Sequence, residues 1–271
     1  MSTSQNPPSQ SVRYLPTNEA YDRWAAVYDT DGNFLQALDT TELKTLFPKF
    51  LLSITSPKPW RVVDLGCGTG RNTSLLLRVS DVAEVIALDS SKGMLEVARS
   101  RLQKSNDATT GIDLARTPPK LHLEVFDMLA SPSSPALAQL VDGVISTLVV
   151  EHVPLSIFFS HISQMLRPGG VLLLTNMHDQ MGAISQAGFV DVSTGEKIRP
   201  TSYVHTVADV IAEADKYGFD IEETGEQEKE GIRERAVESD MVDILGPRSK
   251  KWVGVMCWFG GLFRKRRGQN T

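Results

Sequence analysis

The chain has 271 residues, of which 41% are hydrophobic and 23% charged, and its formal net charge is −5. This composition is typical of a soluble globular protein, and the length permits one large domain or two small ones. The acidic balance argues against nucleic acid as a partner.

The cysteines and the apolar segments limit the compartment in which we expect the protein. Cys67 and Cys257 are too far apart in sequence to form a metal or redox motif, and no histidine or cysteine pair has metal-ligand spacing. The longest late apolar run, residues 252–263, is about half the length of a membrane span. The first residues lack the basic-then-apolar pattern of a signal peptide. We therefore expect a cytoplasmic protein with no metal and no membrane contact.

The chain begins with a polar segment followed by two expected helices. Residues 1–16 are rich in Ser, Gln, Asn and Pro, which predicts a disordered N-terminus. In the region 17–56, the first helix carries Tyr21, Trp24 and Tyr28 at helical spacing on one face, and a second helix is expected at about residues 40–54. The aromatic face either packs this helix onto the core or covers a ligand.

Residues 60–176 alternate between apolar runs and helical patterns. The expected strands are 60–65, 83–88, 121–126, 143–147 and 171–175. This alternation predicts a parallel sheet with right-handed crossovers, in which ligands bind beyond the carboxyl ends of the strands. Four polar residues lie at such ends: Asp64, Asp89, Asp127 and Ser146.

The rest of the chain is less regular. Residues 105–119 are expected to form a polar surface insertion. Residues 177–205 are expected to form an irregular substrate-side insertion that walls the acceptor pocket, with a hairpin that turns at Thr194 and Gly195. Within 206–264 we expect a helix at 206–217, strands at 219–223 and 252–263, and a charged, solvated helix or loop at 225–240. Residues 265–271 form a basic tail.

The glycine-rich turn after the first strand limits the type of ligand. Gly66, Gly68 and Gly70 follow Asp64, and no Lys-Ser/Thr pair of a phosphate-binding loop comes after them. A dinucleotide site would need a glycine where Arg71 stands, and Asp64 would repel a pyrophosphate. A ligand with positive charge near the turn fits better.

The motifs resemble those of the class I S-adenosylmethionine-dependent methyltransferases. D-L-G-C-G-T-G at residues 64–70 resembles the first motif of that family, and A-L-D-S-S-K-G-M-L-E-V-A-R resembles the second. F-D-M, I-S-T-L-V-V-E-H-V and L-R-P-G-G-V-L-L-L are similar to the third, fourth and fifth. The resemblance implies a single α/β methyltransferase domain over residues 17–264. Its Rossmann-like sheet would be mostly parallel, with one antiparallel strand near the C-terminus, and 17–56 would form a helical lid.

The resemblance also implies S-adenosylmethionine as the cofactor and a set of residues that hold it. Asp89 would accept hydrogen bonds from both ribose hydroxyls, Met94 would pack on the adenine, and Asp127 would accept from the adenine amino group. The full set of implied cofactor-binding residues is Tyr21, Tyr28, Asp64, Gly66, Cys67, Gly68, Gly70, Asp89, Ser90, Met94, Asp127, Met128 and Ser146.

The acceptor is expected to be a small organic molecule methylated on an oxygen, nitrogen or sulfur atom. Y-D-R-W-A-A-V-Y-D with this motif set looks like the branch of ubiquinone and menaquinone methyltransferases. The segment H-D-Q-M-G-A-I-S-Q-A-G-F with R-P-T-S-Y-V-H resembles a microbial and fungal subgroup. A related pattern occurs in fungal methyltransferases that act on thiols of secondary metabolites, which suggests secondary metabolism.

Four residues are candidates for contact with the acceptor or for a general base: His152, His178, His205 and Tyr203. A hydroxyl or ammonium acceptor must lose a proton, whereas a thiolate or tertiary amine needs no base. The alternative role for each candidate is loop hydrogen bonding or capping. His122 and His161 are expected to be structural.

Two other functions compete with small-molecule methylation. One is a non-catalytic binding or regulatory protein that keeps the cofactor fold. The other is a protein or nucleic-acid methyltransferase, which is less favoured because S-T-L-V, and no N-P-P-Y motif, follows the fourth strand. We expect a monomer or homodimer whose partner is the small acceptor, with no nucleic acid.

Overall fold

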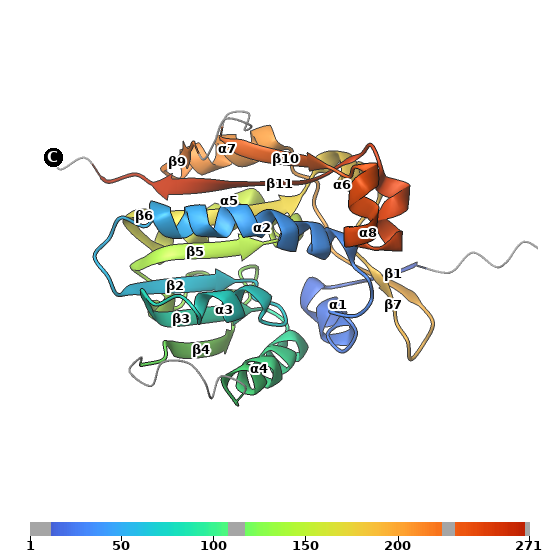
Figure 1. The fold of residues 1–271 in the computed structure, drawn as a ribbon, viewed down its shortest axis with the longest axis horizontal. Helices are drawn as coiled ribbons and strands as arrows, with labels where there is room; N and C mark the ends of the chain where they lie inside the picture. Colours follow the sequence, from blue (N-terminus) through green and yellow to red (C-terminus); the bar gives the residue numbers. More distant parts are fainter. Residues whose placement is uncertain (1–11, 108–116, 224–230, 269–271) are drawn as a thin grey trace, which may run out of the picture.

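The computed structural model describes residues 12–107, 117–223 and 231–268. In this part of the chain an eight-stranded sheet has the order β10-β11-β6-β5-β2-β3-β4, and β9 pairs with β11 beside β10 (Figure 1). Its strands are β2 (Trp60–Leu65), β3 (Val82–Asp89), β4 (Lys120–Val125), β5 (Val141–Thr147), β6 (Leu166–Met177), β9 (Phe219–Glu222), β10 (Ile232–Ala236) and β11 (Met256–Lys265).

The strand directions confirm the expected fold class. The strands from β4 to β6 pair in parallel, while β11 pairs antiparallel with β6, β9 and β10. Among the described strands of this sheet, only β11 therefore runs against the others. The five strands expected between residues 60 and 176 all form, although β6 is longer than the expected strand at 171–175.

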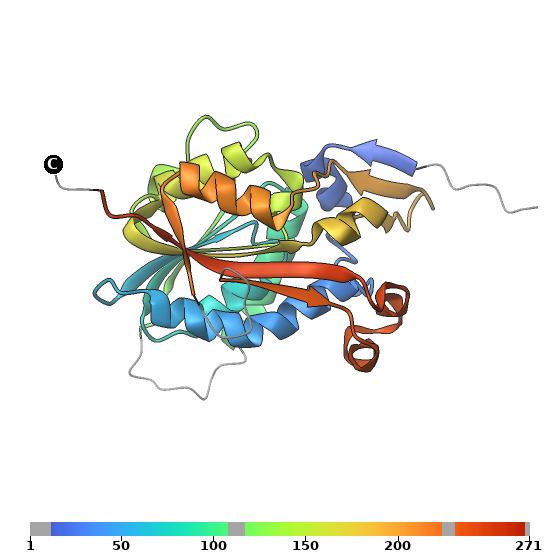
Figure 2. The same ribbon diagram turned by 90° about the horizontal axis from the view of Figure 1, so that it is seen from above.

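Helices cover both faces of the sheet, as the edge-on view in Figure 2 shows. On one face α2 (Phe34–Ser53) and α3 (Arg71–Leu76) pack over β2, β3 and β6, with Phe50 and Leu38 fully buried. On the other face α5 (Leu155–Met165) packs over β5 and β6, and α7 (Val207–Lys216) packs beside it over β9, with Phe158 and Phe159 fully buried. Strands buried on both faces need continuous apolar runs, which explains the pattern in the sequence.

The two helices of the expected N-terminal lid lie in different places. α1 (Thr17–Trp24) packs against α4 (Lys92–Asp107) and the β1–β8 strands, whereas α2 lies across the sheet and belongs to the core. α2 also begins at Phe34, earlier than the expected start near residue 40, because the Asn33 side chain caps it by accepting from the backbone N–H of Leu35.

A second, three-stranded sheet corrects the expectation that residues 1–16 are disordered throughout. Strand β1 (Val12–Leu15) pairs in parallel with β8 (Lys197–Pro200), which pairs antiparallel with β7 (Phe189–Val190). The order of β1 therefore comes from a strand far away in the sequence. The β7–β8 hairpin confirms the expected turn, and Gly195 has a positive φ of 72°. Residues 1–11 lie outside the described part.

The charged segment 225–240 is also corrected, since it contributes strand β10 to the sheet. Arg233 and Arg235 on this strand form ion pairs with the buried Glu42 of α2, at 2.9 and 2.7 Å. These pairs account for a charged strand at a sheet edge. Residues 224–230, most of the polar insertion (108–116) and the last three of the basic tail (269–271) lie outside the described part.

The remaining helical segments are short: η1 (Ala136–Ala138), η2 (Val150–His152), α6 (Asp179–Ile184), η3 (Ser239–Met241), α8 (Val242–Leu245) and η4 (Pro247–Trp252). None of the described helices is both long and apolar enough to span a membrane.

Candidate active site

The glycine turn after β2 is tied closely to its neighbours. Gly66, Gly68 and Gly70 have positive φ angles of 73°, 52° and 82°. A Cβ on Gly66 would lie 2.2 Å from Cγ2 of Val149, so a larger residue cannot fit there. A Cβ on Gly68 would meet nothing within 4 Å, because this glycine faces a cavity.

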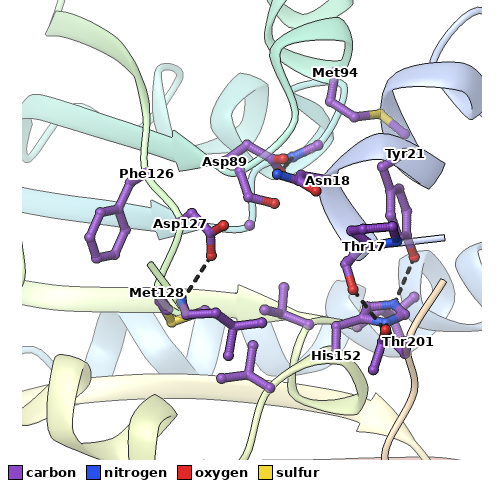
Figure 3. Close-up of a pocket in the computed structure, with 18 of the residues that line it drawn as sticks. Thr17, Asn18, Tyr21, Asp89, Met94, Phe126, Asp127, Met128, His152 and Thr201 are labelled. Atoms are coloured by element: carbon purple, nitrogen blue, oxygen red, sulfur yellow. Dashed lines mark hydrogen bonds between the residues drawn. The ribbon is translucent and has the colours of Figure 1, made fainter. Parts of the chain in front are cut away.

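The cavity, here called the main cavity, has a volume of about 600 Å³ and lies at the carboxyl ends of the parallel strands. This is the place at which ligands of such sheets bind. Figure 3 shows that side chains from α1, the strand ends and the segment after β8 converge on it. It is lined by Tyr14, Leu15, Pro16, Thr17, Asn18, Tyr21, Tyr28, Leu65, Gly66, Gly68, Asp89, Ser90, Met94, Phe126, Asp127, Met128, Leu129, Thr147, Leu148, Val149, His152, Val153 and Thr201.

Asp89 is held with its carboxylate fixed at the end of β3. Its two oxygens accept from the backbone N–H groups of Gly68 and Ser91, each at 2.8 Å. Desolvation raises the pKa of Asp89, although these two hydrogen bonds lower it. A carboxylate oxygen has two lone pairs, so each oxygen can accept a further bond from a ligand hydroxyl in the cavity.

Asp127 provides a second carboxylate on the same wall. Its Oδ1 accepts from the backbone N–H of Leu129 at 2.8 Å (Figure 3), while Phe126 and Met128 supply apolar surface beside it. Met94 lines the cavity near Asp89. Two carboxylates and apolar surface suit a hydroxylated ribose, an aminopurine and a cationic centre, and they disfavour a phosphate. The residues present therefore fit S-adenosylmethionine.

Four of the residues expected to hold the cofactor do not line the cavity. Asp64 is buried, and its Oδ2 accepts from the Thr73 hydroxyl at 2.6 Å, while burial raises its pKa to about 6. Cys67 is buried in a small apolar cluster, Gly70 is the N-cap of α3, and the Ser146 hydroxyl donates to the Leu65 carbonyl. These residues support the turn and the strand ends from behind. The other nine expected residues line the cavity.

His152 bridges the lid and the segment after β8. Its Nδ1 lies 2.8 Å from the Thr201 carbonyl oxygen and its Nε2 lies 2.8 Å from the Tyr21 hydroxyl (Figure 3). Because a carbonyl only accepts, Nδ1 carries a proton. In the neutral ring Nε2 accepts from the Tyr21 hydroxyl, whereas in the protonated ring Nε2 donates, with Glu151 Oε1 3.3 Å from the same nitrogen. Burial alone would lower the pKa of His152, but the Glu151 carboxylate beside it raises the pKa overall.

The other three catalytic candidates lie away from the main cavity. His178 is the N-cap of α6 and its Nε2 lies 2.8 Å from Glu234. His205 stacks on Tyr203 with ring centroids 5.7 Å apart, and its Nε2 contacts the Val153 carbonyl. These contacts match the alternative roles of capping and loop hydrogen bonding.

Several residues that shape the site were not found from the sequence. Asp22 accepts from the Ser91 hydroxyl and from the backbone N–H of Gly93, and Asp29 accepts from Thr69 in the glycine turn. These bonds hold residues 22–29 against the glycine turn and the start of α4. They join positions 40 or more residues apart, so no local pattern points to them.

Comparisons with known proteins agree with this geometry. Residues 63–174 match the model of a methyltransferase domain family. The chain is 48% identical to an uncharacterised methyltransferase of Emericella nidulans, over 94% of this chain and 93% of the relative. It is 29% identical over 156 residues to a non-reducing polyketide synthase of Penicillium brasilianum, a match that covers 56% of this chain and 6% of that protein.

Among solved structures, the fold is similar to that of a DhpI complex with S-adenosylhomocysteine. The TM-score is 0.58 at 17% identity, and the match covers 92% of this chain and 95% of that one. The relative from Emericella nidulans, the family model and the strand-end carboxylates together establish that the chain belongs to the class I S-adenosylmethionine-dependent methyltransferases.

Proposed function

We propose that this methyltransferase acts on a small organic acceptor. The main observation in support is the main cavity, which α1 covers at the carboxyl ends of the strands. There the Tyr21 hydroxyl lies 2.8 Å from Nε2 of His152. A cavity of about 600 Å³ is within the range of small-molecule sites. The similarity to part of a fungal polyketide synthase supports a role in secondary metabolism.

When bound, S-adenosylmethionine supplies a methyl group already activated by its positively charged sulfur. The protein must then mainly hold donor and acceptor in line and exclude water, and such positioning lowers a barrier by about 7–11 kcal/mol at most. Asp89 and Asp127 hold the donor side, and the bonds from Asp22 to Ser91 and Gly93 keep α1 closed over it.

Both nitrogens of His152 are engaged, so the group that faces the acceptor is the Tyr21 hydroxyl. Desolvation raises the pKa of Tyr21 well above its ordinary value, which keeps this hydroxyl protonated. Tyr21 is placed to receive the proton of a hydroxyl or ammonium acceptor while it passes its own proton to Nε2 of His152. S-adenosylmethionine bound beside Asp89 and Asp127 would supply the methyl group as an electrophile and would leave with the electron pair of its carbon–sulfur bond, so Tyr21 and His152 need only take the acceptor's proton.

Methyl transfer from labelled S-adenosylmethionine to a panel of phenols, amines and thiols tests this proposal. We expect label in a small organic product. Label only in added protein or nucleic acid, or no transfer to any member of the panel, would contradict it. A monomeric or homodimeric state and a cytoplasmic location remain predictions from the sequence.

A further inference from the structure

A second cavity, of about 260 Å³, adjoins the main cavity on the side of the lid. The two cavities share Tyr21, Tyr28 and Leu148 in their linings, so these three residues form the boundary between them. A molecule in the second cavity therefore lies next to the cofactor side without occupying it.

Six of the residues that line the second cavity are aromatic: Tyr21, Trp24, Tyr28, Phe34, Phe189 and Trp252. Lys197, Arg248 and Lys251 also line it. Trp24 stacks on Phe189 with ring centroids 5.0 Å apart, and Phe34 stacks on Trp252 at 5.8 Å. All four side chains are at least nine-tenths buried. An apolar cavity of about 150 Å³ holds a benzene molecule, so 260 Å³ admits one substituted ring or two fused rings.

One carboxylate oxygen in this cavity lacks a hydrogen-bond partner. Glu151 is 3% exposed and lines the second cavity. Its Oε1 lies 3.3 Å from His152, whereas its buried Oε2 has no hydrogen-bond partner. A buried carboxylate oxygen without a donor is costly, so this position suits a hydroxyl or amino group of a ligand.

The boundary residue Leu148 is itself strained. It has a φ of 57°, in the left-handed region that bulky residues rarely adopt. Its backbone N–H donates to the Thr175 carbonyl at 2.9 Å, which holds the strained turn in place. Strained backbone of this kind is concentrated at functional sites. Here it places the Leu148 side chain between the two cavities.

We infer that the second cavity binds the methyl acceptor, and that this acceptor is an aromatic molecule with a hydroxyl or amino group, separate from the group that is methylated, that donates to Glu151. The inference rests on the proposed function, because it assigns the acceptor side of the same reaction. Like-charge repulsion from Glu151 disfavours an acceptor that presents a carboxylate beside this residue, although Lys197, Arg248 and Lys251 also line the cavity. Glu151 binds and orients the acceptor, and so determines specificity.

A series of naphthalenes that differ in one group tests the acceptor class. Calorimetry with the S-adenosylhomocysteine complex would compare 2-naphthol and 2-naphthylamine with 2-methoxynaphthalene and 2-naphthoate. We expect the two donors to bind at least tenfold more tightly than the ether or the acid. Equal affinity for 2-naphthol and its methyl ether would overturn the inference. Absence of S-adenosylhomocysteine binding would instead contradict the proposed function.

Variants of the second cavity test whether Glu151 causes the preference for 2-naphthol. Glu151→Gln should weaken 2-naphthol binding by roughly 10- to 150-fold, the usual range for a charged hydrogen bond, with unchanged affinity for S-adenosylhomocysteine. Glu42→Gln is the matched control, since Glu42 is a buried glutamate that pairs with Arg233 and Arg235 and lines neither cavity. Unchanged binding in Glu151→Gln would exclude Glu151 as the anchor.

A second variant fills the space and does not alter Glu151. Ala187 is half-buried and lines the second cavity, so Ala187→Phe should block 2-naphthol while S-adenosylhomocysteine still binds. If 2-naphthol binds Ala187→Phe as tightly as the wild type, the acceptor does not occupy this cavity and the inference is wrong.

Discussion

The main cavity and the second cavity share a boundary but are built in different ways. The floor of the main cavity consists of residues that directly follow β2, β3, β4 and β5, and it carries two fixed carboxylates. The second cavity is enclosed by aromatic side chains from α1, α2, the α6–β7 segment and η4. The donor side is thus part of the sheet, whereas the acceptor side is assembled from segments around its edge.

This difference explains how one fold can serve many acceptors. A fixed donor geometry requires the strand ends and the glycine turn, which the packing of the sheet constrains on all sides. The surrounding segments can change without disturbing that packing. Substitutions on the two sides should therefore have different consequences.

The largest effect is expected in the glycine turn. Gly66→Ala places a Cβ 2.2 Å from Val149 and forces alanine to a φ of 73°, so it should destabilise the protein by more than about 2 kcal/mol. Thermal or urea unfolding measures this loss. Gly68→Ala is the matched control, because its Cβ meets nothing within 4 Å. Gly68→Ala should lose only the stability that a positive φ costs an alanine. Its methyl group should weaken S-adenosylhomocysteine binding, because Gly68 lines the main cavity. Equal stability of Gly66→Ala and Gly68→Ala would contradict the conclusion that Val149 leaves no room for a side chain at Gly66.

Tyr21→Phe tests the boundary between the cavities. It removes the hydroxyl that bonds to His152, so turnover of a phenol should fall by about 100-fold or more, the usual contribution of a general acid-base group. Affinity for S-adenosylhomocysteine, measured by calorimetry, should change little. Phenol turnover equal to that of the wild type would remove Tyr21 and His152 from the proton path.

Asp64→Asn tests whether this residue binds the cofactor or supports the turn. Burial raises the pKa of Asp64 from 3.8 to about 6, so its ionisation costs stability as the pH rises through 6. The asparagine variant should be more stable than the wild type at pH 8, by about 2–3 kcal/mol, and this gain should vanish near pH 4. Urea unfolding at both pH values provides the measurement. A large loss of S-adenosylhomocysteine affinity with no gain in stability would show a direct role in binding.

The smallest effect is expected from the protonation of His152. The raised pKa of this residue means that protonation stabilises the folded state fully below about pH 6.5, and that this contribution is lost as the pH rises through the folded value. The difference in unfolding free energy between the wild type and His152→Gln should therefore be larger at pH 6 than at pH 9. A difference that grows with pH would show that the Glu151 carboxylate does not stabilise the imidazolium.

The donor side could largely be predicted from the sequence because its determinants are local. Asp89 and Asp127 each follow an apolar strand, and the glycines follow the first of these strands. Asp64 shows the limit of this reasoning. It also ends a strand, but its side chain points back to Thr73 and does not reach the cavity.

The sequence indicated 177–205 as a segment beside the acceptor, but not the contacts of the acceptor side, because these contacts connect distant parts of the chain. Strand β1 is ordered by β8, and α1 is fastened by Asp22 to the start of α4. His178, His205 and Tyr203 have residue types suited to catalysis, yet each is engaged elsewhere. Glu151 was not predicted as a binding residue, because the feature that indicates this role is a buried Oε2 without a hydrogen-bond donor, and the sequence does not show it.

The most direct test of the account is a calorimetric titration of S-adenosylhomocysteine into the wild type and into Asp89→Ala. The fixed carboxylate of Asp89 is the centre of the donor site, with Gly68 and Ser91 holding its oxygens. We predict one binding site per chain in the wild type and a loss of about 1.5–3 kcal/mol for each charged hydrogen bond removed. Equal affinity in the two proteins, or no binding by the wild type at millimolar concentration, would contradict the account.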